Sequence, residues 1–251
     1  MKKTSLEQLH REHQPDAIEK RLNADNNPQT ISDAVLGAID GCITTFAVVC
    51  GAFGAGFSAS VALILGFANL LADGFSMAVS NYEASKAQLE LREQARRMEE
   101  EHIDRVPDGE QEEIRQLFQM KGFSGEILEA IVTTISQDRQ LWVETMLVEE
   151  HGLQKAEITP WRSAGVTFAT FLLAGSIPLL PFFVGGLTMR WQFIFSTALA
   201  GAVFFAIGTL KSLVFAKPIL RAGLGTLLTG GAAAAIAYLT GYLLQQSFGV
   251  F

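Results

Sequence analysis

The feature that most constrains this chain is a set of long apolar segments, each with at most one charged residue. A helix needs about 20 mostly apolar residues to cross the hydrocarbon core of a bilayer. Each segment meets that length, and the sequence therefore predicts an all-α integral membrane protein with five transmembrane helices. The segments cover approximately residues 34–54, 59–79, 164–187, 193–213 and 222–244.

The charge of the chain is concentrated between the second and third apolar segments. Residues 84–163 hold 10 of the 19 Lys and Arg residues and 17 of the 26 Asp and Glu residues, so they carry the whole net charge of −7. A nucleic-acid binder needs a basic face, which this chain lacks. A soluble enzyme could not hide the apolar segments, because 49% of all residues are hydrophobic. Both classes are therefore disfavoured.

The acidic segment has the pattern of a folded helical domain. The residues from Phe75 to Val106 contain no Gly or Pro, so the second span is expected to continue as a helix until Pro107. We expect Asp108 to cap a helix through residues 112–120, Ser124 to cap another, and residues 141–151 to form the last. The predicted organisation is an N-terminal tail at 1–32, spans at 33–83, a helical metal-binding domain at 84–163 and spans at 164–251.

The distribution of Lys and Arg predicts the orientation. Basic residues lie in the N-terminal tail, in the acidic segment and between the fourth and fifth spans, whereas the links on the other side hold only Arg190. The positive-inside rule places the N-terminus and residues 84–163 in the cytoplasm and the C-terminus on the opposite side. We expect a bacterial inner membrane rather than a vacuolar membrane, since no organelle-targeting segment is visible.

Carboxylates in the acidic segment occur at spacings that place them on common helix faces. Glu99 and His102 are three residues apart, as are Glu110 and Glu113 on the next helix. Met146 and Glu150 are four apart on the last helix. Oxygen, imidazole and thioether ligands suit Fe²⁺ or Mn²⁺ better than Ca²⁺. The alternative is a solvated charged face, which is common on Glu-rich helices.

Polar residues also interrupt the first two spans. Asp33, Asp40 and Thr44 share one stripe of the first span. A stripe of the second span holds four polar or thioether side chains: Asn69, Asp73, Met77 and Ser80. Ionisable residues at membrane depth are costly, which makes Asp40 and Asp73 candidates for an ion path, with Met77 as a soft ligand. A structural hydrogen bond for Asp40 and ordinary packing for Met77 are the alternatives.

The first span also contains Gly37 and Gly41 at the GxxxG spacing. This spacing permits close helix approach, and it suggests that the first span lies at a dimer interface.

These residues resemble the vacuolar iron transporter family. The resemblance rests on DAVLGAIDGCITTFAVVCG and ADGFSMAVSNYEASKA, followed by an acidic helical block and three spans. It implies a homodimeric, proton-coupled Fe²⁺ antiporter whose path contains Asp40 and Met77. It further implies a cytoplasmic domain that binds several metal ions through glutamates and a methionine. The positions of this chain that match those ligands are Glu99, Glu110, Glu113, Met146 and Glu150.

The chain departs from the family pattern at three places. His102 stands where the family has a glutamate, and Leu147 stands where another is expected. Histidine can still bind a divalent metal, whereas leucine cannot. The third departure replaces the familiar GEY motif by Ser80-Asn81-Tyr82.

Three functions remain open from the sequence. The first is proton-coupled export of Fe²⁺, or of Mn²⁺, Zn²⁺ or Co²⁺, through Asp40, Thr44, Asp73 and Met77. It requires no resident cofactor and no nucleic acid, and it is not an enzymatic activity. The second is a membrane-tethered di-iron ferroxidase or metal sensor, although the Glu-x-x-His pairing that di-iron bundles use twice occurs only at Glu99 and His102. The third is a membrane scaffold that binds basic partners.

Overall fold

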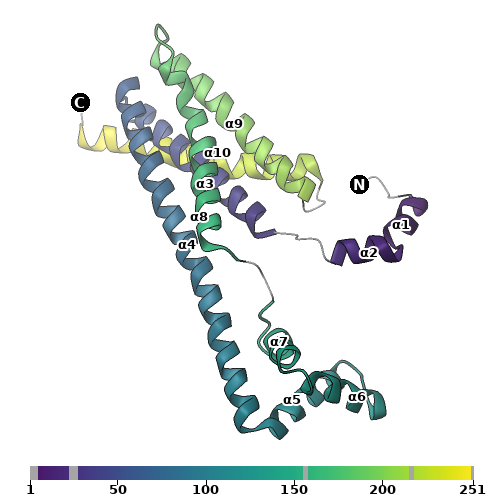
Figure 1. The fold of residues 1–251 in the computed structure, drawn as a ribbon. Coiled ribbons are helices and arrows are strands. Elements are labelled where there is room, and N and C mark those ends of the chain that lie inside the picture. Colours follow the sequence, from purple (N-terminus) through teal and green to yellow (C-terminus); the bar gives the residue numbers. More distant parts are fainter. Residues whose placement is uncertain (1–4, 23–27, 155–157, 215–217, 250–251) are drawn as a thin grey trace. The chain divides into compact units, whose positions relative to one another are not determined.

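Every regular element in the described part of the chain is a helix. The computed structural model describes residues 5–22, 28–154, 158–214 and 218–249 (Figure 1). It divides into two compact units, one formed by Met1–Tyr82 with Trp161–Phe251 and the other by Glu83–Pro160. We call these the membrane unit and the acidic unit. The all-helical class predicted from the sequence is confirmed.

Within the residues that the structure describes, five helices are long and apolar enough to cross a membrane, and their number agrees with the predicted number of spans. Two short helices, α1 (Leu6–Glu12) and α2 (Pro15–Leu22), precede them in the region expected to be a polar tail, and neither buries a residue. The five are α3 (Pro28–Gly54), α4 (Ala59–Arg105), α8 (Pro160–Ser176) with its continuation, α9 (Met189–Val214) and α10 (Ile219–Phe248). As expected, α4 runs without a break through residues 75–105 and ends before Pro107.

The third span changes its winding where the two prolines occur. The α-helix α8 ends at Ser176, and the chain continues as the 3₁₀ helix η1 (Ile177–Phe183), which contains Pro178 and Pro181. Proline removes an amide donor from an α-helix, and the chain winds as the tighter 3₁₀ helix where the two prolines occur. The hydroxyl of Ser196 on α9 donates to the carbonyl oxygen of Pro178 at 2.7 Å and holds this segment.

Glycines set the contact between α3 and α8. A Cβ atom on Gly41 would lie 2.8 Å from the Cα of Phe171, and a Cβ on Gly175 would lie 2.6 Å from the carbonyl oxygen of Gly41. Gly37 is packed in the same way against the backbone of Thr167. The GxxxG spacing is therefore used inside the subunit, where α8 is the helix that approaches it. That the first span also lies at a dimer interface stays a prediction.

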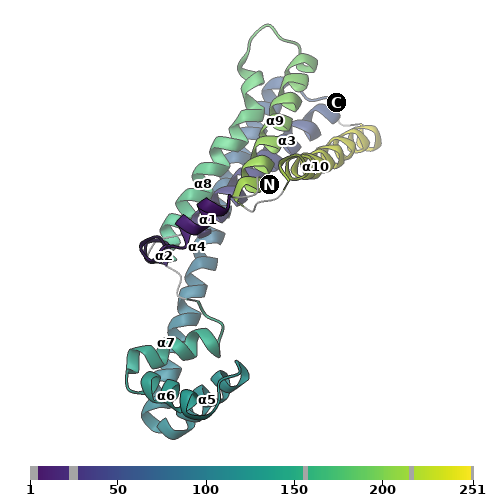
Figure 2. The same cartoon turned by 90° about the vertical axis from the view of Figure 1, so that its right-hand side faces the viewer.

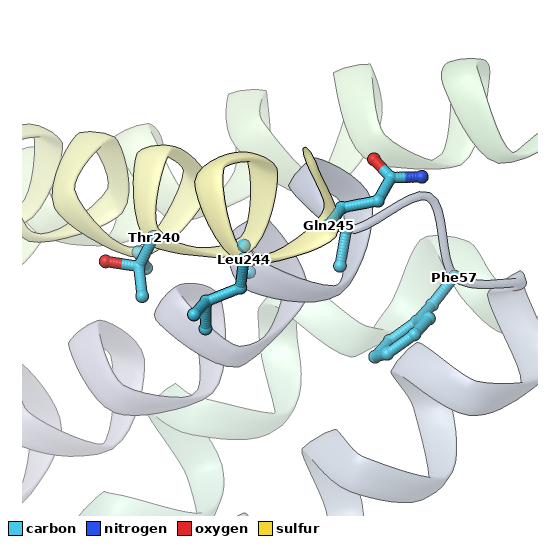
Figure 3. Close-up of a pocket in the computed structure, with 8 residues that line it drawn as sticks. Phe57, Thr240, Leu244 and Gln245 are labelled. Carbon is cyan, nitrogen blue, oxygen red and sulfur yellow. The ribbon is translucent and has the colours of Figure 1, made fainter. Parts of the chain in front are cut away.

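An apolar cavity of about 490 Å³ lies between the C-terminal parts of α3 and α10. Figure 3 shows Phe57, Thr240, Leu244 and Gln245 around it, and small residues such as Gly51 and Gly241 form its remaining wall. No titratable side chain lines this cavity among the described residues, so it offers no charged ligand for a metal ion.

The acidic unit is built from the last part of α4 and three shorter helices, α5 (Pro107–Met120), α6 (Gly125–Ser136) and α7 (Arg139–Glu149), which lie together in both views (Figures 1 and 2). Its apolar core contains Ile114, Val143, Met146 and Leu147, each at most 2% exposed. This burial explains why so acidic a segment folds, because apolar area is removed from water beneath the charged surface.

Two helices in this unit have boundaries that differ from the prediction. The helix α5 begins at Pro107 rather than after Asp108, since proline at the first position lacks only an amide that would be unpaired there anyway. The helix α7 begins after Asp138, whose carboxylate accepts hydrogen bonds from the amides of Gln140 and Leu141, and it ends at Glu149. The expected helix over residues 141–151 was therefore too late at both ends.

The glycine contact between α3 and α8 can be tested by a single added methyl group. Gly41→Ala is expected to lower the stability of the membrane unit by about 1–3 kcal/mol, because the new Cβ atom would overlap the backbone of α8. Thermal unfolding of the purified protein in detergent measures the effect. Gly165→Ala on α8 is the matched control, since nothing lies within 4 Å of its added Cβ atom. Equal unfolding temperatures for the two variants would contradict the close contact between α3 and α8 at Gly41.

Candidate metal centre

One face of α4 organises the acidic unit. Arg92, Arg96, Glu99 and Ile103 follow one another at spacings of three or four residues, which aligns them on this face. The guanidinium of Arg92 donates to Glu144 on α7 at 2.5 Å and to the carbonyl oxygen of Leu153 at 2.6 Å, and Arg96 also pairs with Glu144. These bonds hold α7, and the turn that follows it, against the part of α4 that contains Glu99.

The turn after α7 brings a histidine to Glu99. Gly152 has a positive φ of 68°, which glycine adopts easily, and the amide of Leu153 donates to the carbonyl oxygen of Leu147 at 2.8 Å. This geometry places the Nε2 atom of His151 2.8 Å from a carboxylate oxygen of Glu99. Ligand atoms of Glu99, Glu150 and His151 all lie within 4.8 Å of one another, which is close enough for one ion to contact all three.

A second imidazole–carboxylate pair lies next to the first. The Nδ1 atom of His102 is 3.3 Å from a carboxylate oxygen of Glu110, which lies on the first turn of α5. Glu113 follows Glu110 by three residues and is exposed. The charges of Glu99, Glu113 and Glu150 all act on Glu110, so the two pairs form one electrostatic cluster.

Two carboxylates in this cluster are buried without full hydrogen bonding. Glu99 is 1% exposed and Glu110 is 3% exposed, and the Oε2 atom of each has no hydrogen-bond partner. A buried polar atom without a partner costs about 1–3 kcal/mol, and more when it is charged. A divalent cation bound between these oxygens would remove the cost.

The pKa shifts have the same origin. Burial, followed by the negative charges of Glu113 and Glu99, raises the pKa of Glu110 to about 7, while His102 opposes the shift. Burial, and then the charges of Glu99 and Glu113, also raise the pKa of Glu150. Such mutual repulsion among carboxylates is what a bound cation relieves. Carboxylate and imidazole ligands together suit divalent transition metals such as Fe²⁺, Mn²⁺, Co²⁺ or Zn²⁺.

The structure brings five of the six sequence-predicted ligands into this cluster: Glu99, His102, Glu110, Glu113 and Glu150. The sixth, Met146, is fully buried in the apolar core together with Leu147. Leu147 therefore serves in packing at the position where the resemblance leads one to expect a carboxylate.

His151 was missed by the sequence analysis. Residues 150 and 151 would point in different directions if the helix continued through them, because adjacent helical residues do not share a face. The helix ends at Glu149, however, and the turn at Gly152 directs both side chains to Glu99. The signal in the sequence was the glycine directly after Glu-Glu-His.

In the membrane unit, Asp40 lines a cleft of about 440 Å³ that Ser32, Val35 and Lys211 also border. Asp40 on α3 lies near enough to Asp73 on α4 for their charges to interact. The hydroxyl of Thr44 donates to the backbone carbonyl oxygen of Asp40 at 2.9 Å, and Met77 packs against the apolar core. The two aspartates that the sequence singled out are thus brought together, and Asp40 has open space beside it.

The Ser80-Asn81-Tyr82 variation has a structural role. The side-chain amide of Asn81 donates to Asp33 at 2.9 Å and to the hydroxyl of Thr167 at 2.7 Å. Gln29 also donates to the same oxygen of Asp33, at 3.2 Å. Asp33 is 3% exposed, so these neutral donors partly replace the water that this carboxylate has lost. Asn81 therefore connects α3, α4 and α8 through one buried polar group.

Comparisons with known proteins find relatives that cover most of this chain. The sequence model of the VIT family matches residues 31–242. The vacuolar iron transporter of Toxoplasma gondii is 30% identical over 238 residues, which cover 90% of this chain and 79% of that protein. Vacuolar iron transporter 1 of Tulipa gesneriana is 27% identical over 243 residues, covering 96% and 95% of the two chains. Vacuolar iron transporter 1 of Arabidopsis thaliana is 27% identical over 219 residues, covering 87% of each.

The raised pKa of Glu110 predicts how the metal-free acidic unit responds to pH. Its ordinary value is 4.5, so between pH 4.5 and about 7 the folded state holds a proton that the unfolded chain has lost. The free energy of unfolding should therefore fall as pH rises through this window. Glu110→Gln removes the ionisable group, so its free energy of unfolding does not fall in this window. At pH 8 the acidic unit of this variant should be more stable than that of the parent by on the order of 2 kcal/mol. Hydrogen exchange of the amides of α5, measured in the presence of a chelator, reports the change.

Glu112→Gln is the matched control on the same helix. Hydrogen bonds from Gln116 and Arg115 lower the pKa of exposed Glu112, so its removal should give no gain in protection at pH 8. If Glu110→Gln exchanges as fast as the parent at pH 8, the electrostatic interpretation of the cluster is wrong.

Proposed function

The chain belongs to the VIT family, and from this membership together with its buried carboxylates we propose that it exports divalent transition-metal ions, Fe²⁺ in the first place, from the cytoplasm. Metal transport is what the family implies. In our proposal the acidic unit captures the ion, Asp40 and Asp73 pass it through the membrane unit, and protons move in the opposite direction. Mn²⁺, Zn²⁺ and Co²⁺ are the competing substrates to test.

The observation that carries the proposal is the pair of buried, incompletely bonded carboxylates Glu99 and Glu110. Each faces an imidazole at 2.8 or 3.3 Å, and each keeps one oxygen without a partner. A folded chain maintains such groups at a cost in stability, which a bound cation offsets. In the sequence, the acidic unit lies between the second and third spans. The positive-inside rule supports a cytoplasmic location for this unit.

Proton coupling follows from the chemistry of the same ligands. A carboxylate or imidazole must lose its proton before it binds a metal ion, so binding and release of metal exchange the ion for protons. Asp40 supports this exchange within the membrane unit, because it lines a cleft and interacts with Asp73. Two neighbouring carboxylates repel each other, and a cation bound between them relieves that repulsion.

One observation favours a second function. His151 adds a second imidazole to the carboxylates of the cluster, and di-iron sites in helical bundles contain two histidines together with glutamates. A ferroxidase would consume O₂ when Fe²⁺ is added, whereas a capture site would bind Fe²⁺ and leave the O₂ concentration unchanged. An oxygen electrode with the purified full chain separates the two functions.

Metal binding by the cluster is tested by calorimetric titration of the full chain in detergent with Mn²⁺, Zn²⁺ and, under anaerobic conditions, Fe²⁺. Glu99→Gln and His151→Ala should each weaken binding by about ten- to hundredfold, as expected when a coordinating group is lost. Glu126→Gln on α6 is the control, since this exposed carboxylate lies outside the cluster. Unchanged affinity in both cluster variants would exclude the proposed capture site.

Transport is tested by Fe²⁺ uptake into proteoliposomes under a pH gradient. Asp40→Asn should reduce uptake more than tenfold, because the amide cannot exchange a proton for a cation at this depth. Calorimetric binding by the acidic unit should remain. Asp16→Asn on α2 is the control, because it removes the same negative charge at an exposed position. It should leave Fe²⁺ uptake intact. Full uptake by Asp40→Asn would refute the proposed path.

A further inference from the structure

A second polar cleft, of about 430 Å³, opens between α9 and α10 in the membrane unit. It has a basic lining, in contrast to the acidic groups discussed above. Its polar side chains come from the end of α9 and the beginning of α10, and Ile39 of α3 completes the wall. They are Lys211, Ser212, Arg221, Thr226 and Thr229.

The two cations of this cleft have no acidic partner among the described residues. In the acidic unit, by contrast, Arg92, Arg115 and Arg139 are all paired with carboxylates. Lys211 and Arg221 instead border one cleft whose lining contains no Asp or Glu. Two positive charges that face the same space repel each other, and an anion placed between them converts that repulsion into attraction.

The packing beside the cleft fixes the positions of these cations. A Cβ atom on Gly208 would lie 2.7 Å from the Cα of Gly223, and a Cβ on Gly223 would lie 2.6 Å from the ring of Phe205. The backbones of α9 and α10 are therefore in close contact at these two glycines. Gly208 lies about one turn before Lys211 on α9, and Gly223 lies two residues after Arg221 on α10. The cleft itself is open, because nothing lies within 4 Å of an added Cβ on Gly225, which lines it.

The surface next to the cleft is apolar and exposed. Leu220, Leu224 and Leu228 follow one stripe of α10 that begins beside Arg221, and they are 68%, 51% and 73% exposed. Leu210, next to Lys211, is 61% exposed. A ligand that fits both features has an anionic group for the cations and hydrocarbon for the leucines.

We propose that this cleft binds the phosphate group of an anionic phospholipid, with an acyl chain along the leucines of α10. Lys211 and Arg221 would pair with the phosphate oxygens, and the hydroxyls of Ser212, Thr226 and Thr229, which can rotate, provide further hydrogen bonds. A free phosphate ion shares the anionic chemistry but gains nothing from the leucines. The site is independent of metal capture, although Lys211 and Ile39 also border the cleft of Asp40.

Native mass spectrometry of the full chain in detergent, with phosphatidylglycerol or phosphatidylcholine added, tests the proposal. The anionic lipid should bind at least tenfold more tightly than the zwitterionic one. Lys211→Gln and Arg221→Gln should each reduce this preference about fivefold, as expected for basic groups near a membrane surface. The double variant should bind the two lipids equally. Lys211→Arg and Arg221→Lys keep the charge and should keep the preference.

Arg190→Gln is the matched control, since Arg190 is also exposed and begins the opposite end of α9. It should bind the anionic lipid as the parent does. Equal binding of the two lipids by the parent, or an equal loss in Arg190→Gln, would overturn the site. Displacement of the lipid by millimolar inorganic phosphate would show that the occupant is a soluble anion and would overturn the lipid assignment.

Discussion

A carboxylate that leaves water must be neutralised by a proton, by hydrogen-bond donors or by a cation, and each of these solutions is relevant to this molecule. One oxygen of Asp33 accepts hydrogen bonds from the neutral amides of Asn81 and Gln29. Glu110 holds its proton up to about pH 7. Glu99 faces His151 with one oxygen and leaves the other without a partner. The hydrogen bonds to Asp33 are a fixed part of the fold, whereas a proton or a cation can leave its carboxylate. This difference separates Asp33 from Glu99 and Glu110, which are suited to an exchangeable ion.

The apolar environment explains much of what the sequence could predict. The five spans were found because about 20 apolar residues in succession have few other uses. The unbroken course of α4 followed from the absence of Gly and Pro before Pro107. The grouping of Glu99, His102, Glu110, Glu113 and Glu150 was anticipated from helical spacing and from resemblance to the family.

What the sequence could not predict depended on contacts between elements. GxxxG indicated close approach, but only the structure shows that α8 is the helix that approaches Gly41. His151 was overlooked because the end of α7 was placed two residues late, and an error of two residues at a helix end changes the direction in which a side chain points. The basic cleft between α9 and α10 joins Lys211 and Arg221, whose relation depends on the glycines at the crossing rather than on any motif.

The turn that contains His151 has a consequence for the range of ions that the acidic unit can accept. Glu99 and Glu110 belong to helices, whose repeating backbone bonds allow little displacement, whereas His151 lies past the last turn of α7, beside Gly152. A non-helical segment can shift by a fraction of an ångström without breaking a ladder of hydrogen bonds. One wall of the proposed site is thus rigid and the other compliant, so a cation bound there would not need to match one fixed radius.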